Sequence, residues 1–283
     1  LAHRFSDSLL VVMRAYVEKP RTRTGWKGLV NDPHLDESYD IGRGLRVSRQ
    51  LLADIVGMGL PVGCEFLDPL TSRYLSDTVS WASIGARTAQ SQVHRQLSSG
   101  LNMPVGIKNA TSGRIEDAVD GVVAAGHGHV FLGISDDGAV ATITTGGNPD
   151  CHVVLRGGSS GPNYGPLDVT AALDLLASAH VDRGVVIDAS HGNSRKDHER
   201  QPDVVADIAR RVGEGEAGIA GVMVESFLLP GRQNLVPGRA DLLTYGRSIT
   251  DACAGWGATV SMVENLAHAV ETRRAIHTRT FVT

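Results

Sequence analysis

Cysteine is scarce in this sequence of 283 residues. The three cysteines, Cys64, Cys151 and Cys253, are odd in number, lie far apart and form no C-x-x-C pair. Paired cysteines hold small secreted domains together, and closely spaced cysteines bind structural zinc. The sequence therefore argues against a disulfide framework and against a cysteine zinc site, and it indicates a reducing, cytoplasmic compartment.

Long apolar runs and an excess of positive charge are also lacking. No hydrophobic stretch approaches the roughly 20 residues of a membrane-spanning helix, and the first dozen residues carry Arg4 and Asp7 rather than a signal-peptide pattern. The 27 basic and 31 acidic side chains give a formal charge of -4, which offers no general attraction to nucleic acid or to an anionic membrane surface. We expect a protein that binds neither.

Short apolar segments rich in valine and isoleucine alternate with stretches of helical periodicity, the pattern of a parallel α/β fold. The segments are too uniformly apolar for a half-exposed sheet, so they predict strands buried on both faces. The predicted strands are Leu9–Val17, Val62–Leu67, Ala82–Ala86, Val105–Lys108, His129–Ile134, His152–Arg156, Val185–Asp188 and Gly221–Glu225. The predicted helices include Leu45–Val56, Ile115–Ala125, Val169–Ala179 and Val204–Val212, with Asp168 and Asp203 as N-caps of the last two, and a final helix at about Val260–Arg273.

One interval between strands is too long for a single βα unit. The stretch from Lys108 to Arg156 contains Asp137-Gly138 between two apolar runs, which is a strong signal for a β-hairpin. We therefore predict an inserted hairpin near 130–144 and one domain, 1–283, that is a (β/α)8 TIM barrel with seven visible strands. Because an apolar run begins almost at once after Leu1, we expect an N-terminally incomplete chain whose first strand is missing. The segments Leu9–Val17 and Gly221–Glu225 would then be unpaired edges, which predicts poor stability and little activity.

Charged side chains follow nearly every predicted strand, and in barrels the carboxyl ends of the strands form the active-site rim. A single cation there would be an ordinary solvated strand end, but repetition from strand to strand favours a pocket. Guanidinium groups bind phosphate oxygens bidentately and ammonium groups act as point charges, so this rim suits substrates with more than one phosphate. The cations are Arg14, Lys19, Arg21, Arg87, Lys108 and Arg156.

Imidazole and carboxylate groups form a second set at the same rim. Glu65, His191, Glu225 and Asp251 make a ligand set for Mn, Fe, Co or Zn. His127 and His129 resemble a chelating pair, but they lie at a junction between a helix and the hairpin, away from the strand ends, and we expect structural roles for them. The Gly-rich segment 156–164 follows a strand and indicates either a phosphate cradle or a turn.

Nine motifs follow one another along almost the whole chain. They are Met13–Thr22, Gly25–His34, Ile84–Thr88, Ser91–Arg95, Pro104–Asn109, Cys151–Gly158, Ile187–Ser194, Gly221–Ser226 and Ser248–Cys253. In this order they resemble the type I 3-deoxy-D-arabino-heptulosonate 7-phosphate (DAHP) synthases, in their long microbial branch regulated by aromatic amino acids. The resemblance implies a transferase of the shikimate pathway.

The resemblance implies condensation of phosphoenolpyruvate with D-erythrose 4-phosphate and water, which gives DAHP and phosphate. It also implies a divalent metal ion, a homo-oligomer and an aromatic amino acid effector. It assigns phosphoenolpyruvate to Arg14, Lys19, Glu65, Ala86, Arg87, Lys108 and Arg156. It assigns erythrose 4-phosphate to Lys19, Pro20, Arg21, Thr22 and Arg156, and the metal to His191, Glu225 and Asp251.

The family's catalytic roles fall on Lys19, as the proton carrier, and on Arg14, Lys108 and Arg156. Its fourth metal ligand is a cysteine in a first-strand motif that this sequence does not contain, so we expect weaker metal binding. We expect no replacement from Cys64, because it faces away from Glu65 on a strand, or from Cys253.

Two other functions remain open at this point. A metal-free aldolase would use Lys108 as a Schiff-base amine, which requires a depressed lysine pKa. A catalytically impaired barrel would bind phosphosugars or partners as a regulatory subunit.

Overall fold

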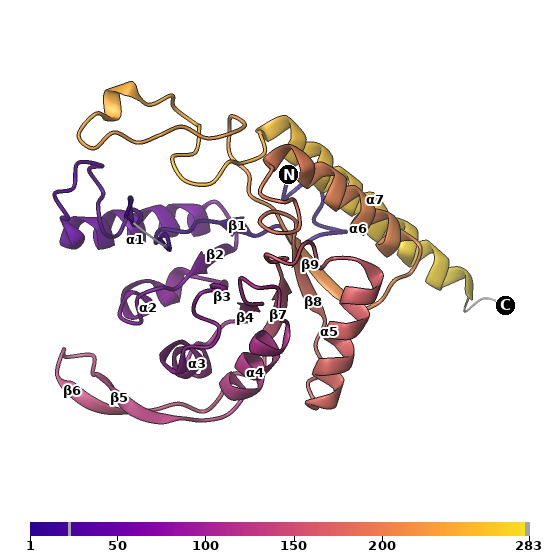
Figure 1. Cartoon of the computed structure of the whole chain (residues 1–283), viewed down its shortest axis with the longest axis horizontal. Coiled ribbons are helices and arrows are strands. Elements are labelled where there is room, and N and C mark those ends of the chain that lie inside the picture. Colours follow the sequence, from indigo (N-terminus) through magenta and orange to yellow (C-terminus); the bar gives the residue numbers. More distant parts are fainter. Residues whose placement is uncertain (22–23, 281–283) are drawn as a thin grey trace.

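A sheet of seven parallel strands forms the centre of the computed structural model (Figure 1), which describes residues 1–21 and 24–280, with the side chains of 277–280 left out. The strand order is β1-β2-β3-β4-β7-β8-β9. The strands are β1 (Met13–Arg14), β2 (Val62–Glu65), β3 (Trp81–Ile84), β4 (Val105–Lys108), β7 (His152–Leu155), β8 (Val185–Asp188) and β9 (Ile219–Met223). This is the predicted α/β succession of a (β/α)8 barrel, and the predicted edges are confirmed because β1 and β9 end the sheet.

The helices surround this sheet, and the last two, α6 and α7, pack side by side (Figure 1). The helices are α1 (Ile41–Gly57), α2 (Thr71–Leu75), α3 (Gln92–Ser99), α4 (Glu116–Ala125), α5 (Pro166–Ser178), α6 (Gln201–Gly213) and α7 (Trp256–Thr280). The described residues also form the short 3-10 turns η1 (Ser76–Thr78), η2 (His198–Arg200) and η3 (Ala240–Leu242). In the described part of the chain, no helix has the length and hydrophobicity needed to span a bilayer.

The predicted N-caps of two helices were wrong. The N-cap of α5 is Gly165, and the Asp168 carboxylate accepts a hydrogen bond from the Gly165 N–H at 3.1 Å from within the first turn. Asp203 likewise lies inside the first turn of α6. Both helices begin earlier than predicted because Pro166 and Pro202 stand in their first turns, where a fixed φ suits the helix.

The predicted hairpin is confirmed. Strands β5 (Val130–Ile134) and β6 (Val140–Thr144) pair antiparallel in a sheet of their own, beyond α3 and α4 (Figure 1). Gly138 has a φ of +84° in the connecting turn, a conformation that favours glycine.

The first of the visible strands that we predicted, Leu9–Val17, was too long. Only Met13 and Arg14 pair with β2, opposite Val62 and Gly63. A strand at the end of a sheet has one hydrogen-bonded neighbour, so an apolar sequence there does not guarantee a long ladder.

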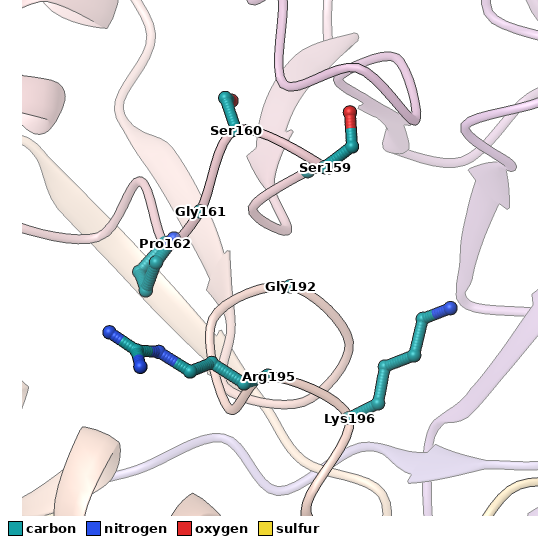
Figure 2. A pocket seen from close by; sticks show the side chains of 8 residues that line it. Ser159, Ser160, Gly161, Pro162, Gly192, Arg195 and Lys196 are labelled. Atoms are coloured by element: carbon teal, nitrogen blue, oxygen red, sulfur yellow. The ribbon is translucent and has the colours of Figure 1, made fainter.

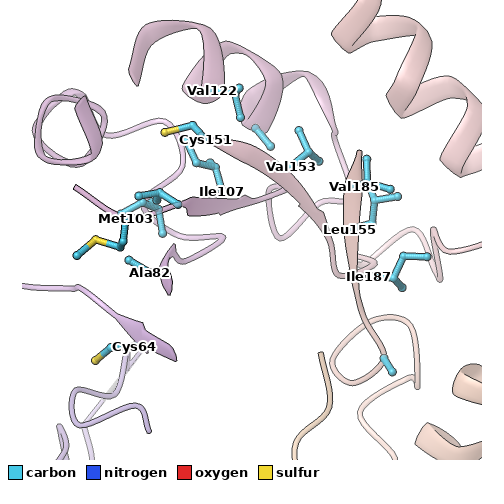
Figure 3. Packing of buried hydrophobic residues seen from close by; sticks show 14 of the residues in the cluster. Cys64, Ala82, Met103, Ile107, Val122, Cys151, Val153, Leu155, Val185 and Ile187 are labelled. Atoms are coloured by element: carbon cyan, nitrogen blue, oxygen red, sulfur yellow. The ribbon is translucent and has the colours of Figure 1, made fainter. Parts of the chain in front are cut away.

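The hydrophobic core lies between the sheet and the helices (Figure 3). Ile107, Leu155 and Ile187 are fully buried within it. Because neighbouring residues of a strand point to opposite faces, the residues that follow Ile107 and Ile187, namely Lys108 and Asp188, point to the other side of the sheet. The packing of the core therefore fixes where these charged side chains meet.

We predict that Leu155→Ala lowers the free energy of unfolding by about 2–5 kcal/mol, because it leaves a cavity in a packed core. The matched control is Leu167→Ala on α5, where the side chain is 86% exposed. This control should change the free energy by no more than about 0.5 kcal/mol. Urea unfolding of both variants measures the difference, and equal effects would contradict the described core.

Candidate active site

Charged side chains from three strands meet inside the barrel, at the carboxyl ends of the strands. The Lys108 Nζ lies 3.3 Å from Asp188 Oδ2 and 3.9 Å from Glu65 Oε2. All three residues are buried. Since parallel strands bring their carboxyl ends to one edge, β2, β4 and β8 together build a charged site there.

The two ends of the sheet also meet through side chains. Arg14, at the end of β1, donates a hydrogen bond to Glu225 Oε1 at 3.1 Å, just beyond β9. The Arg14 guanidinium lies 4.1 Å from the centre of the Tyr16 ring, and the Tyr16 hydroxyl lies 2.8 Å from Ser83 Oγ. Burial alone would raise the pKa of Glu225, but the charges of Arg14 and His191 lower it, so this carboxylate is an anion.

Three potential metal ligands are grouped beside these charges. His191, Glu225 and Asp251 each offer a ligand atom, and these atoms lie within 4.8 Å of one another. His191 Nε2 is 3.8 Å from Glu225 Oε1, while its Nδ1 is 2.9 Å from Asp188 Oδ2. One imidazole nitrogen is therefore held by a carboxylate and the other faces the ligand group, as in many metal sites.

Gln201 fixes the backbone of Glu225. Its Oε1 accepts a hydrogen bond from the Glu225 N–H at 2.8 Å, and its Nε2 donates to the Glu225 carbonyl at 3.0 Å. Gln201 is fully buried at the start of α6. Sequence reasoning missed both Gln201 and Asp188 as site residues. Asp188 ends a predicted strand, which was a usable signal, whereas nothing in the sequence marked Gln201.

The two lysines of the site differ in their electrostatics. The pKa of Lys19 is lowered, first by burial and then by the charge of Arg14. Burial would also lower the pKa of Lys108, but the neighbouring Tyr16, Asp188 and Glu65 raise it above the ordinary value. Lys108 is therefore an ammonium ion that suits an anion, and Lys19 releases its proton more readily.

Most of the other predicted substrate residues lie at the same rim. Arg156 is buried, with its Nη1 donating to the Gly157 carbonyl at 3.2 Å, and its pKa is lowered chiefly by burial. Arg87 follows β3, next to Ala86, and its charge acts on Arg156.

The predicted erythrose 4-phosphate segment is described only in part. Lys19 N–H donates to the Lys27 carbonyl at 2.8 Å, and Arg21 Nε donates to the Trp26 carbonyl at 2.8 Å. Pro20 lies between them, and Thr22 lies outside the described residues. The side chain of Arg21 is thus held by the loop that follows it.

Comparison with known proteins decides the family. The model of the DAHP synthetase I family matches residues 1–264. The chain belongs to this family. It is 51% identical over 280 residues to a phospho-2-dehydro-3-deoxyheptonate aldolase of Corynebacterium glutamicum, covering 97% of this chain and 76% of that protein. It is 50% identical over 274 residues to the Phe-sensitive enzyme of that name from Escherichia coli, covering 97% and 77%.

A solved structure gives the same result for the fold. The phospho-2-dehydro-3-deoxyheptonate aldolase of Francisella tularensis superposes with a TM-score of 0.93 at 47% identity, and covers 96% of this chain and 79% of that one. The predicted membership of the DAHP synthases and the predicted barrel fold are both confirmed.

Among the described residues, the group of potential metal ligands does not include His127, His129, Cys64 or Cys253. His127 Nδ1 and His129 Nε2 each lie 2.8 Å from a backbone carbonyl oxygen of α4, so they are hydrogen-bonded rather than paired as ligands. Cys64 is buried in the core, which raises its pKa to about 12. Cys253 Sγ donates to the Asp251 carbonyl at 3.5 Å and is not a member of the ligand group.

The Gly-rich loop of this family member is a turn. A hollow of about 460 Å³ separates Gly158–Pro162 from Gly192, Arg195 and Lys196, with Arg195 reaching toward Pro162 and Lys196 extending the other way (Figure 2). The loop amides already have protein acceptors: Gly157 N–H donates to Asn163 Oδ1 at 2.6 Å, Gly158 N–H to the Gly161 carbonyl at 2.9 Å, and Ser159 N–H to the Thr111 carbonyl at 2.9 Å. These amides are not available to cradle phosphate, so of the two earlier interpretations the turn holds.

We predict that Gln201→Leu weakens Mn²⁺ binding by roughly 10- to 100-fold, since removing the partner of a ligand residue commonly has this effect. The control is Asn148→Leu, because Asn148 is also a buried amide that holds backbone carbonyls, those of Ser98, Leu101 and Met103. Both variants should be less stable, but only Gln201→Leu should lose metal affinity in a calorimetric titration. An equal loss in both would show that Gln201 has no specific role at the site.

Proposed function

We propose that this chain is a DAHP synthase, a single-domain barrel that condenses phosphoenolpyruvate with D-erythrose 4-phosphate and water to give DAHP and phosphate. The observation that carries the proposal is the position of Lys108 and Arg14 beside the group formed by His191, Glu225 and Asp251. Anion-binding cations and metal ligands thus share one end of the barrel. The named relatives support the same reaction.

His191, Glu225 and Asp251 would hold a divalent ion such as Mn, Fe, Co or Zn. An imidazole nitrogen and two carboxylates suit these ions, and Asp188 at Nδ1 leaves the His191 Nε2 for coordination. When bound, the ion would supply Lewis-acid polarisation of the aldehyde oxygen of erythrose 4-phosphate.

The cations would bind and orient phosphoenolpyruvate. Lys108 is buried as an ammonium ion, and Arg156 and Arg87 lie at the same rim, so the three can neutralise a carboxylate and a phosphate. Glu65 Oε1 is buried and has no hydrogen-bond partner among the described residues, so it can accept from a bound water or hydroxyl group. A Cβ at Gly85 would lie 2.7 Å from this oxygen, which explains the glycine.

In the proposed reaction, carbon 3 of phosphoenolpyruvate forms a bond to the aldehyde carbon, and water adds at carbon 2. The bond between carbon 2 and the phosphate oxygen then breaks, and phosphate leaves. Lys19 carries a proton, because its lowered pKa lets it exchange one near neutral pH more readily than an ordinary lysine. Holding two mutually repelling anions in one orientation supplies much of the rate.

We also infer that an aromatic amino acid acts as effector. Relatives at 50% and 48% identity are named Phe-sensitive and Trp-sensitive. A hollow of about 880 Å³ lies between the β5–β6 hairpin and helices α2 and α3, with Leu97, Phe131 and Ile143 among its apolar side chains and Gln96 among its polar ones. A cavity of this composition suits an amphipathic ring compound.

The direct test is to incubate the purified chain with phosphoenolpyruvate, erythrose 4-phosphate and Mn²⁺, and to measure DAHP and phosphate together. Because the family's cysteine ligand is not in this sequence, we expect a low rate, but equal amounts of both products and loss of both when a chelator removes the ion. Borohydride treatment with substrate should trap no adduct, because a Schiff base at Lys108 needs a lowered pKa, whereas Tyr16, Asp188 and Glu65 raise this pKa despite burial. A trapped adduct at Lys108, or turnover in the presence of chelator, would contradict the proposal.

We predict that Lys19→Arg lowers kcat by about 10²- to 10⁴-fold with a smaller change in the KM for phosphoenolpyruvate, because arginine keeps the charge but does not release a proton. In the unmodified chain, activity that needs the Lys19 ammonium should decline as the pH rises. Because the pKa of Lys19 is lowered, the decline should occur at a lower pH than for an ordinary lysine. Steady-state kinetics against pH check both points. The control, Lys27→Arg, should keep kcat, and a normal kcat in Lys19→Arg would remove Lys19 from the mechanism.

A further inference from the structure

One carboxylate oxygen contacts both halves of the site. Asp188 Oδ2 lies 3.3 Å from Lys108 Nζ and 2.9 Å from His191 Nδ1. The other oxygen, Oδ1, accepts hydrogen bonds from the backbone N–H and the hydroxyl of Ser190, both at 3.0 Å. Asp188 is fully buried, so it acts on substrates through these partners and does not touch them itself.

Asp188 is an anion in this setting. Burial alone would raise its pKa, but the nearby charges of His191 and Lys108 hold the pKa well below its usual range. Hydrogen bonds inside a protein polarise one another, and two donors on the same carboxylate oxygen compete for its electron density. A stronger bond to one donor therefore weakens the hold on the other.

Each partner of Asp188 serves a different ligand. His191 turns its Nε2 toward Glu225 and Asp251, the proposed metal ligands. Lys108 is the buried ammonium proposed to face phosphoenolpyruvate, with Glu65 Oε2 at 3.9 Å as its other carboxylate partner. The single oxygen of Asp188 thus contacts one residue of each proposed binding site, beside the separate ion pair between Arg14 and Glu225.

We propose, on the basis of the synthase function above, that Asp188 is a positioning residue that couples divalent metal binding to phosphoenolpyruvate binding through this shared oxygen. A cation at His191 Nε2 polarises the ring and strengthens the Nδ1–H bond to Asp188. The carboxylate then holds Lys108 less tightly, and more of the ammonium charge is available to the substrate. Coupling of this kind is reciprocal, so each ligand raises the affinity for the other by the same factor.

The test is a set of calorimetric titrations without turnover: Mn²⁺ alone, phosphoenolpyruvate alone, and each in the presence of the other. In the unmodified chain we expect each ligand to raise the affinity for the other by a factor in the range of about 5- to 150-fold. In Asp188→Asn, Mn²⁺ affinity should fall roughly 10- to 100-fold, and the coupling factor should fall close to one. A merely structural role would weaken the binding of both ligands but leave the coupling factor unchanged. An unchanged coupling factor in this variant therefore overturns the proposal.

Two further variants keep the result interpretable. Asp150→Asn removes a carboxylate that pairs with Arg183 at 2.9 Å before β7, and it should keep the coupling factor. Lys108→Met tests the link from the other side, even if Asp188→Asn does not fold: Mn²⁺ alone should bind several-fold more tightly. This gain in Mn²⁺ affinity should exceed the gain in Arg156→Met, which removes a nearby charge that has no hydrogen bond or ion pair to Asp188. A gain in Lys108→Met that is equal to or smaller than that in Arg156→Met contradicts the proposal.

These binding measurements also separate the two proposals. Coupling that depends on Asp188 in a chain without synthase activity would support the link and contradict the proposed function. Synthase activity together with a coupling factor that survives Asp188→Asn would support the proposed function and contradict the role of Asp188 in the coupling.

Discussion

Burial of a lysine against carboxylates at the end of the barrel is the constraint on which the site depends. An ion pair taken out of water repays its desolvation only when the geometry is good and the remaining hydrogen bonds are made. Lys108, Asp188 and Glu65 come from three different strands, so the pairing requires β2, β4 and β8 to keep their register. The removal of one partner would leave a buried charge uncompensated, at a cost of about 3–5 kcal/mol. Stability and function therefore depend on the same contacts.

The same contacts separate two kinds of chemistry within a small space. Cations that suit phosphate and carboxylate groups lie on one side of Asp188, and the imidazole and carboxylates that suit a divalent ion lie on the other. Arg14 joins the two sides, because it stacks on Tyr16 and pairs with Glu225. Since Arg14 is the last residue of β1 and Glu225 lies just beyond β9, this ion pair also connects the two ends of the sheet.

The sequence predicted the parts of the fold that are governed by local pattern. Strands β4 and β8 were predicted residue for residue, because strands covered on both faces are uniformly apolar. The hairpin followed from Asp137-Gly138. Helix α3 was missed because its residues are largely polar, and its buried His94 is held by Ser91 and by the Leu67 carbonyl, contacts that no periodicity reveals.

The candidate site was predictable as far as position along a strand decides it. Lys108, Arg156 and Glu225 were found because each stands at or just after the end of an apolar run. The supporting residues were not found, because Asp188 and Gln201 gain their roles from partners on other elements. Gln201 contacts a residue 24 positions away, and only the folded chain brings its amide to the Glu225 backbone.

A crystal structure of the chain with Mn²⁺ and phosphoenolpyruvate tests this account most directly. The account predicts anomalous density between His191, Glu225 and Asp251, and phosphoenolpyruvate bound against Lys108 and Arg156, with Asp188 between the two ligands. Manganese held by other side chains, or phosphoenolpyruvate bound away from Lys108, would contradict it.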